Sequence, residues 1–563
     1  MTTALLKNKK RPKGEKNMTA AFDQALLEAR FKKTGHEGLA LDTCGRSLGL
    51  LAATIAVSLS SAPSWAGVLP EGGQITLGQA TLTRAGDQLI IEQKTRDLSA
   101  TWQSFSIGQG NKVTFKQPSV DAVAVNRVLG SDVSAIQGAL ESNGKVFLIN
   151  PNGILFSKTA QVNVGALVAS TLELGESEAL TRKYTLKGTS AAAVINHGSI
   201  MTRDEGGTVA LVAARVVNTG TIETPKGSTI MASGSKVLLD LGGPAQIEIE
   251  EGALNAWVEQ GGAIRADSGM VFLTAKLAKA LSQTVIKHTG TTEAKTMAQG
   301  QTAGKILLVG DMAHGHADIG GSFDVSASNG GDGGFVETSA ARLSFKDDFG
   351  VKLHSTAGRP GNWLIDPYDF TIRNVGGDIS ATAIQSALAA GNVTIQTLDA
   401  GVTCVGLAGC GVGSFGGGDI FVEDDITWST NKLTLNAYRN VLVYANLDAS
   451  GGGSLDVLFG QGTAAGTASQ YRVSSGATVK IPLPTTSGNV STSKFRWKKG
   501  SSGTLNDLIW NNGNLRFGPT IDRSAVNAQG QLDQPYYFDN VTSGRSGFYQ
   551  LTYSDYPLDL EIG

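Results

Sequence analysis

The chain has 563 residues, among them 47 Lys and Arg, 49 Asp and Glu, and 72 Gly. Residues 1–66 hold ten of the basic and five of the acidic residues, which leaves 37 against 44 and a net charge of −7 for residues 67–563. A mildly acidic chain without a basic block lacks the electrostatic footprint of a nucleic-acid-binding protein. We therefore expect no nucleic-acid partner. No segment after residue 66 has the length of a membrane-spanning helix.

Residues 1–66 have the pattern of an extended signal peptide. Leu48–Leu59 is an uncharged apolar run, too short to span a bilayer, and it follows a basic N-terminal region. The run leads into Ala62-Pro63-Ser64-Trp65-Ala66, a small-x-small cleavage pattern, so we predict cleavage between Ala66 and Gly67. A membrane anchor is the alternative, which the short run and its polar exit disfavour. Met18 is an alternative start of translation.

The stretch from Lys145 to Thr171 predicts two apolar strands on either side of a tight turn, Asn150-Pro151-Asn152-Gly153. Proline presets φ for the second turn position, and Asn and Gly tolerate the positive φ that such turns often need. Four further segments precede it in a fixed order: LPEGGQITLGQATL (69–82), WQSFSIG (102–108), VTFKQP (113–118) and AVAVNRVLG (122–130).

Together, residues 69–171 closely resemble the haemagglutination-activity (two-partner secretion) domain of filamentous-haemagglutinin-like exoproteins. The resemblance implies recognition in the periplasm by a dedicated outer-membrane β-barrel transporter of the TpsB type, and release to the medium or the Gram-negative cell surface. The residues that carry over by motif are Asn126, Arg127 and Val128 of NRV, and Asn150, Pro151, Asn152, Gly153 and Ile154 of NPNGI. For each, a buried asparagine or a tight corner without a recognition role is the alternative.

Residues beyond this region repeat with a period of about 21–22 residues. Asn196 of INHGSI recurs as Asn218 of NTGTI, and Gly227 recurs as Gly269 forty-two residues later, which we interpret as two turns of twenty-one. Repeats of this length with short alternating strands and glycine corners are typical of solenoids. We therefore predict an all-β protein, a single right-handed parallel β-helix of the pectin-lyase-like type with an N-terminal cap and few short helices.

The predicted organisation is a signal peptide (1–66), a haemagglutination-activity domain (67–180), coils that complete the secretion domain (181–345), and a C-terminal β-helix extension with an aromatic tail (346–563). Helices are expected at 133–140 and 274–283, and a short helix leading into a strand at 383–397. Trp363, Tyr368 and Phe370 are interpreted as core residues where the coil changes shape, with ligand-binding aromatics as the alternative. The tyrosines of the last 28 residues are interpreted as a cap over the open end.

Chemistry-bearing residues are sparse. Cys404 and Cys410 are the cysteines left after the leader, and in an exported chain they predict one disulfide; a metal site would need further ligands nearby. His314 and His316 are interpreted as surface-loop residues. Glu423 and Asp425 share a strand face, with Asp424 opposite, and are interpreted as solvated corner charges. We expect no catalytic site, cofactor or metal.

Three functions compete. The first is a secreted adhesin-type exoprotein, the second a haem-acquisition or host-protein-binding exoprotein on the same scaffold, and the third a glycan-active β-helix enzyme. A host-cell receptor, a glycan or a haem-carrier protein would be the corresponding partner. The sequence does not separate the first two, because no motif marks a ligand-binding loop.

Overall fold

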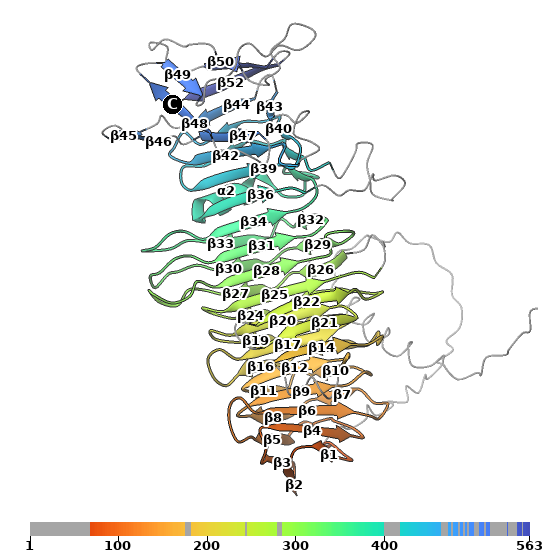
Figure 1. The fold of residues 1–563 in the computed structure, drawn as a ribbon. Helices are drawn as coiled ribbons and strands as arrows, with labels where there is room; N and C mark the ends of the chain where they lie inside the picture. The colour runs from red at the N-terminus through yellow and green to blue at the C-terminus, as the bar shows by residue number, and fades with distance from the viewer. Residues whose placement is uncertain are drawn as a thin grey trace, which may run out of the picture. The chain divides into compact units, whose positions relative to one another are not determined.

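The computed structural model describes residues 68–481, except 175–181, 242–244, 279–283, 399–416, 463–470 and 475–476, and beyond residue 481 it describes the backbone of several strands. These residues form a stack of coils in which parallel strands pair from one coil to the next (Figure 1). Each N-terminal coil contributes one strand to each of three faces. The predicted all-β, right-handed parallel β-helix with an N-terminal cap is confirmed.

The first face runs the length of the stack. Its strands are β1 (Gln74–Leu77), β4 (Asp97–Trp102), β6 (Val123–Val128), β9 (Lys145–Ile149), β12 (Ala166–Ser170), β17 (Thr208–Ala213), β20 (Ser228–Ser233), β25 (Met270–Ala275), β28 (Lys305–Val309), β31 (Phe335–Ser339), β34 (Asn362–Asp366), β36 (Asn392–Gln396), β39 (Lys432–Asn436), β42 (Ser454–Phe459) and β47 (Phe495–Lys499).

The second face follows the first in each coil. It contains β7 (Ser134–Ile136), β10 (Ile154–Phe156), β15 (Ala193–Asn196), β18 (Arg215–Asn218), β23 (Trp257–Gln260), β26 (Thr284–His288), β29 (His316–Ile319) and β32 (Arg342–Phe345).

The third face completes the coil. It contains β2 (Ala80–Ala85), β3 (Gln88–Gln93), β5 (Lys112–Lys116), β8 (Ala139–Ser142), β11 (Gln161–Val164), β16 (Ser199–Thr202), β19 (Thr221–Glu223), β24 (Ala263–Arg265), β27 (Thr291–Glu293), β30 (Ser322–Asp324) and β33 (Gly350–Lys352). β1 and β2 pair antiparallel with β4 and β3, so the N-terminal strands close the first coil as a cap.

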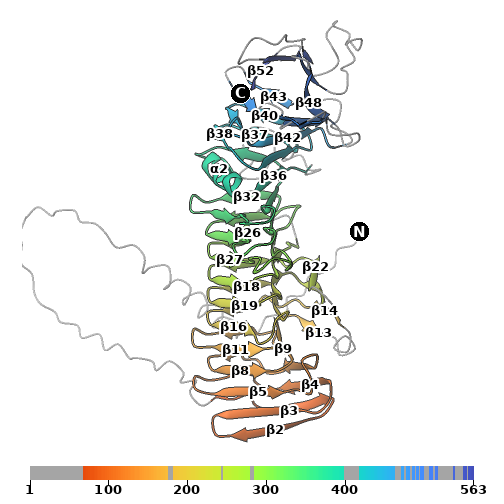
Figure 2. The ribbon, with the colours of Figure 1, turned by 90° about the vertical axis from the view of Figure 1, so that its left-hand side faces the viewer.

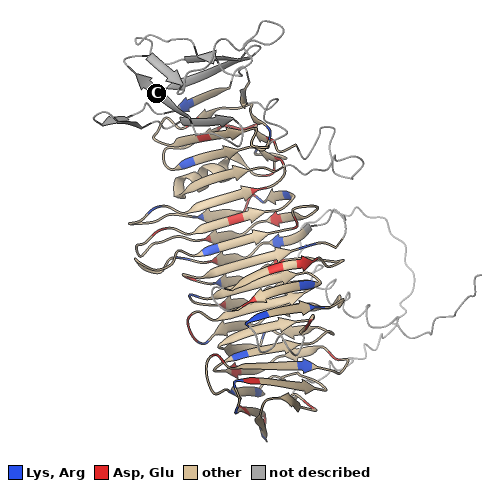
Figure 3. Cartoon of the chain, in the orientation of Figure 1, with Lys and Arg blue, Asp and Glu red and all other residues tan. Residues whose placement is uncertain are grey.

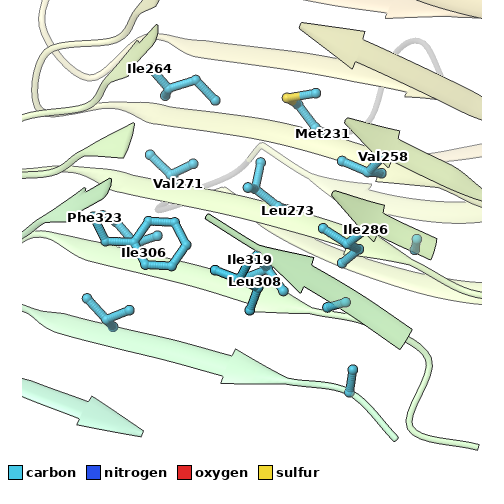
Figure 4. Close-up of a cluster of buried hydrophobic side chains, with 14 of the residues drawn as sticks. Met231, Val258, Ile264, Val271, Leu273, Ile286, Ile306, Leu308, Ile319 and Phe323 are labelled. Atoms are coloured by element: carbon cyan, nitrogen blue, oxygen red, sulfur yellow. The ribbon is translucent and has the colours of Figure 1, made fainter. Parts of the chain in front are cut away.

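Apolar side chains from the three faces meet inside the coils. Figure 4 shows this core with Met231 and Leu273 from the first face, Val258 and Ile286 from the second, and Ile264 from the third. Because side chains alternate along a strand, every second residue of each face points into this core. Stacking therefore buries an apolar column that a single coil could not cover alone.

One inward column is polar. Asn196, Asn218, Gln260 and His288 occupy the same position in successive coils and are fully buried. Nδ2 of Asn196 donates to Oδ1 of Asn218 (2.8 Å), and Nδ2 of Asn218 donates to Oε1 of Gln260 (2.7 Å). Gln260 donates onward to the carbonyl of Gly262 (3.0 Å), and His288 bonds to the carbonyl of Gly320 and to Oγ1 of Thr292, so every member of this buried polar column has a partner.

The forty-two-residue spacing is one coil and not two. Gly269 lies directly against Gly227, and Asn218 pairs with Gln260 forty-two residues on, so these residues belong to neighbouring coils. Between them the chain leaves the coil as a hairpin, β21 (Lys236–Asp240) and β22 (Gln246–Glu251). A hairpin adds length to the chain without adding a coil, so the predicted count of coils was wrong here.

That hairpin joins β13 (Glu173–Leu174) and β14 (Lys183–Lys187) in a four-stranded antiparallel sheet, which we call the outer sheet. Figure 2 shows β13, β14 and β22 lying beside the stack. The outer sheet covers the outward side of the first face and forms a second apolar core, in which Phe147 packs on Tyr184 with ring centroids 4.8 Å apart. Burial raises the pKa of Tyr184 to about 12.

Two of the predicted helices were wrong. Residues 133–140 contain β7 and the start of β8. Of the predicted helix 274–283, residues 274–275 end β25, 276–278 are not helical, and 279–283 lie outside the described residues. Pairing with the neighbouring coils satisfies the backbone of these segments as strands and overrides their helical propensity. The third predicted helix is confirmed as α2 (Ala381–Ala390), which leads into β36. Ser380 caps it by accepting a hydrogen bond from the backbone N–H of Ala383 (3.2 Å).

Helix α2 packs against β33 and β38 (Ile426–Thr427), where the third face would otherwise continue. Two of the three aromatic residues before it that were predicted to be core residues are buried. Trp363 and Phe370 are fully buried and contact Phe345, whereas Tyr368 is only partly buried. The change of coil shape is therefore filled by aromatic side chains.

From β35, just before α2, the coils continue on the first face and on two shorter sheets. One contains β35 (Phe370–Ile372), β37 (Ile420–Val422), β40 (Val441–Val443) and β43 (Tyr471–Val473); the other contains β38 (Ile426–Thr427), β41 (Leu447–Asp448), β44 (Thr478–Ile481), β52 (Tyr556–Ile562), β51 (Tyr549–Tyr553) and β50 (Tyr537–Phe538). The remaining strands are β45 (Thr485–Ser487), β46 (Val490–Thr492), β48 (Asn506–Asn511) and β49 (Asn514–Phe517). Within the described residues, no helix is long and apolar enough to cross a bilayer.

Candidate functional site

The Asn150-Pro151-Asn152-Gly153 turn forms the corner between β9 on the first face and β10 on the second. The N–H of Gly153 donates to the carbonyl of Asn150 (3.0 Å) and closes the turn. Gly153 has φ +117°, in the region that favours glycine, and its own carbonyl accepts from the N–H of Ser134 in the preceding coil (3.1 Å). The predicted turn is therefore present, and it is bonded to the coil below it.

The Asn150 side chain is fully buried and ties two coils together. Its Nδ2 donates to the carbonyl of Asp132 and to Oγ of Ser134, both at 2.9 Å. Its Oδ1 accepts from the N–H of Asn152 (3.0 Å). Because each polar atom of this amide has a partner, no shorter or apolar side chain could replace it without leaving buried groups unpaired.

Asn126 is likewise fully buried, but it points into the main core from β6. Its Oδ1 accepts from the indole N–H of Trp102 (3.0 Å), and its Nδ2 donates to the carbonyls of Ala124 and Phe147, both at 3.2 Å. The amide thus gives the buried indole its acceptor and bonds β6 to β9. Val128, also inward, is 4% exposed within the same core.

Arg127 points the other way, toward the outer sheet. Its Nη1 donates to Oγ of Ser99 (2.6 Å) and its Nη2 to the carbonyl of Leu174 in β13 (2.9 Å). The side chain is largely buried. Asn126 and Val128 of NRV therefore pack in the main core, and Arg127 bonds to the outer sheet.

The two motifs meet at one corner of the surface. Nδ2 of Asn152 donates to the carbonyl of Gly130 (2.8 Å), two residues after Val128. We call the exposed or partly exposed residues Leu129, Pro151 and Asn152 the motif corner. Leu129 is 71% exposed, which is unusual for a leucine beside so much buried structure. Sequence reasoning quoted Leu129 within AVAVNRVLG but did not single it out.

Ser190, which sequence reasoning also missed, supports the same corner. Its Oγ donates to the carbonyl of Pro151 (2.6 Å) from thirty-nine residues along the chain. Ile154, the last residue of NPNGI, is buried as the first residue of β10. The structure thus separates the predicted recognition residues into two sets. Pro151 is partly exposed and Asn152 exposed, and the others are buried: Asn126, Arg127, Val128, Asn150, Gly153 and Ile154.

Some of the other predicted site residues lie in the part of the chain that the structure describes, and others do not. Ala66, Gly67, Cys404 and Cys410 lie outside the described residues, so the cleavage site and the disulfide stay predictions. His314 lies in a turn, as predicted, whereas His316 starts β29 and packs with partial burial. In the described part of the chain, no three His, Cys, Asp or Glu side chains gather closely enough to hold a metal ion.

The acidic residues of FVEDDITW have structural partners. Glu423 pairs with Arg373 (2.9 Å), Asp425 accepts from the backbone N–H of Asn446 (2.7 Å), and Asp424 accepts from the backbone N–H of Asn374. Residues 423–425 lie in the corner between the strands 420–422 and 426–427, so the predicted corner is confirmed and the predicted shared strand face is wrong. Glu423 and Asp424 are only partly exposed, because they bond to neighbouring loops.

Comparison with known proteins identifies the N-terminal region. Residues 66–325 match the family described as the TPS secretion domain. The match ends within the segment 181–345, which the sequence predicted to complete that domain. The crystal structure of the HMW1 secretion domain from Haemophilus influenzae is similar in fold, with a TM-score of 0.52 and 22% identity over 98% of that chain and 73% of this one. Residues 66–325 therefore form a two-partner secretion domain on a β-helix.

Two curated relatives are both described as heme/hemopexin-binding proteins of Haemophilus influenzae. One is 36% identical over 221 residues, which cover 37% of this chain and 24% of the relative. The other is 38% identical over 129 residues, which cover 23% of this chain and 14% of the relative. The chain thus matches a quarter or less of the length of these relatives.

Proposed function

We propose that this chain is an exoprotein of the two-partner secretion pathway, exported through the periplasm and released to the medium or the cell surface by a TpsB-type outer-membrane transporter. The match of residues 66–325 to the TPS secretion domain carries this proposal. NRV and NPNGI lie on neighbouring coils, because β6 pairs with β9. Asn152 bonds to Gly130, so the exposed residues that accompany both motifs form one continuous surface.

In this proposal the motif residues have two different tasks. Asn126, Arg127 and Asn150 are buried and fix the shape of the coils, so they act as positioning residues. The motif corner of Leu129, Pro151 and Asn152 is the surface that the periplasmic part of the transporter contacts. An exposed leucine beside a polar turn that hydrogen bonds hold in place is the composition of a small protein interface.

The contact role predicts that Leu129→Asp reduces release several-fold when the chain is co-expressed with its transporter, because a carboxylate cannot be desolvated in an apolar contact. Release is measured as the ratio of medium to cell-associated protein by immunoblot. Val120→Asp is the matched control, since Val120 is 59% exposed at a different corner. Thermal unfolding should be unchanged in both variants. Equal release of the Leu129 variant and the parent would show that the transporter does not contact the motif corner.

For the exported scaffold we favour an adhesin-type role, in which the coils present loops to host surfaces. Binding of haem or of a host haem carrier is the second candidate, favoured by the names of the two curated relatives. A glycan-active enzyme is the third and has the least support, because Glu423, Asp424 and Asp425 are bonded to neighbouring loops.

A binding comparison separates these candidates. Purified exported protein is expected to bind cultured epithelial cells in a saturable manner, and to capture little hemopexin or haem–albumin from serum on an affinity surface. Retention of hemopexin with the cell binding absent would reverse the order of the first two candidates. Bovine serum albumin without haem serves as the control for non-specific retention.

A further inference from the structure

The outer sheet ends in an open strand edge. Within the described residues, β22 pairs with β21 on one side and with no strand on the other. After β25, Nζ of Lys276 donates to the carbonyls of Ile249 and Glu250 in β22, at 3.1 and 3.0 Å. β22 therefore lies over β25. Since Arg127 of β6 holds β13, the outer sheet follows the order of the coils beneath it, and its open edge faces β28.

The apolar floor under the outer sheet continues past that edge. Ile230, Phe272 and Leu307 occupy one outward column on successive coils. Ile230 is fully buried beneath the outer sheet, whereas Phe272 and Leu307 are only partly covered. Val309 lies beside Leu307, and the column turns polar at Glu337 one coil later. Because strands lie about 4.8 Å apart in a sheet, this partly covered floor is about as wide as one additional strand.

The exposed side of the outer sheet is held by cross-strand pairs of opposite charge. Lys236 pairs with Glu250 (2.7 Å), and Lys187 with Glu251 (3.8 Å). The last strand, β22, presents the exposed Glu248 as well as Glu250 and Glu251, and Figure 3 shows this acidic strand in red. Lys305 lies at the far margin of the floor. A strand added at this edge would continue the pattern if it carried basic residues opposite Glu248.

We propose that the open edge of β22 binds an extended segment of a partner protein in which apolar and basic residues alternate. The apolar side chains of that segment cover Leu307 and Val309, and its basic side chains pair with the glutamates of β22. Backbone hydrogen bonds along the edge supply the rest of the affinity, as in other strand additions. In the free protein, Lys276 occupies two carbonyls of β22 and so guards the edge against non-specific pairing.

A second copy of this chain fits the edge poorly. Antiparallel pairing of two β22 strands would place glutamates opposite glutamates, and like charges in facing positions are destabilising. The surface and its partner are also separate from the motif corner, so this inference does not depend on the proposed export route.

The test uses a fluorescein-labelled heptapeptide of alternating Lys and Val as the probe, and the purified chain at increasing concentration. Fluorescence anisotropy is expected to rise to saturation. Glu248→Lys places a lysine opposite a lysine of the bound peptide, and Leu307→Asp puts a carboxylate in the apolar floor. Each substitution should therefore weaken binding by about tenfold. Asp204→Lys, at an exposed turn on another part of the stack, is the matched charge control and should bind as the parent does. Circular dichroism checks that each variant is folded.

A peptide in which the central Val is replaced by Pro keeps the charge but cannot pair as a strand. It should not bind, and equal binding of the two peptides would reduce the effect to non-specific charge attraction and overturn the proposal. Unchanged affinity in both variants would also overturn it. So would a concentration-dependent dimer in light scattering that Leu307→Asp abolishes, since the occupant would then be a second copy.

Discussion

Replacing Asn150 by alanine is expected to reduce release of the protein several-fold in cells that also express the transporter, while synthesis and removal of the leader continue. The substitution removes two hydrogen bonds to the preceding coil and the acceptor for the Asn152 N–H. Buried groups left unpaired in this way cost about 2–4 kcal/mol together. A loss of that size lowers the population of the correctly folded corner and hence the abundance of released protein.

Asn163→Ala is the matched control, because Asn163 is an exposed asparagine on β11, on the third face of the same coil. Asn126→Ala is expected to behave like Asn150→Ala, since it leaves the Trp102 indole without its acceptor. The measurement compares medium and cell-associated protein by immunoblot, with the thermal midpoint of purified protein recorded for each variant. If Asn150→Ala lowers the midpoint but leaves release equal to the parent, the asparagine is only a structural corner and recognition lies elsewhere.

The second large effect is a loss of stability in mild acid through His288. Burial lowers the pKa of this imidazole to about 4, against 6.5 for a free histidine. In the fold, one ring nitrogen bonds to the carbonyl of Gly320 (2.7 Å) and the other to Oγ1 of Thr292 (2.9 Å). Between pH 6.5 and 4 the unfolded chain binds a proton that the folded chain does not. The contribution of His288 is therefore complete above about pH 6.5 and is lost as the pH falls, by about 2 kcal/mol between pH 7 and pH 5.

His288→Gln isolates this contribution, because glutamine extends the polar column of Asn196, Asn218 and Gln260 and does not titrate. Burial raises the pKa values of Asp366 and Asp378 to about 6, and these groups favour the folded state as the pH falls. Their effect is common to both proteins, so the difference in unfolding free energy between parent and variant should report His288 alone. That difference is measured in urea at several pH values, and a difference that does not change between pH 7 and pH 5 would contradict the prediction.

The candidate site could be located from the sequence, but the tasks of its residues could not. NRV and NPNGI were found by motif, and the turn follows from proline and glycine at their positions. Nothing in the sequence indicates that Asn126 faces Trp102, that Arg127 holds a strand forty-seven residues away, or that Leu129 is exposed. These facts depend on which side of β6 each residue occupies and on what covers that side.

The sequence by itself determined the coil: a period of about twenty-two residues, glycine corners and alternating apolar positions suffice for a parallel β-helix, because each coil needs its neighbours to bury its apolar side. Only the tertiary structure decided how many coils a given length makes. A forty-two-residue spacing is one coil plus a hairpin, and the hairpin is recognisable only once it packs on the first face. The nearly continuous apolar run in β17 and the fully buried β20 are signs of burial on both sides, which strand periodicity alone does not reveal. The same contacts make most of 133–140 strand and place the start of the predicted helix 274–283 in β25, since pairing between coils outweighs local helical propensity.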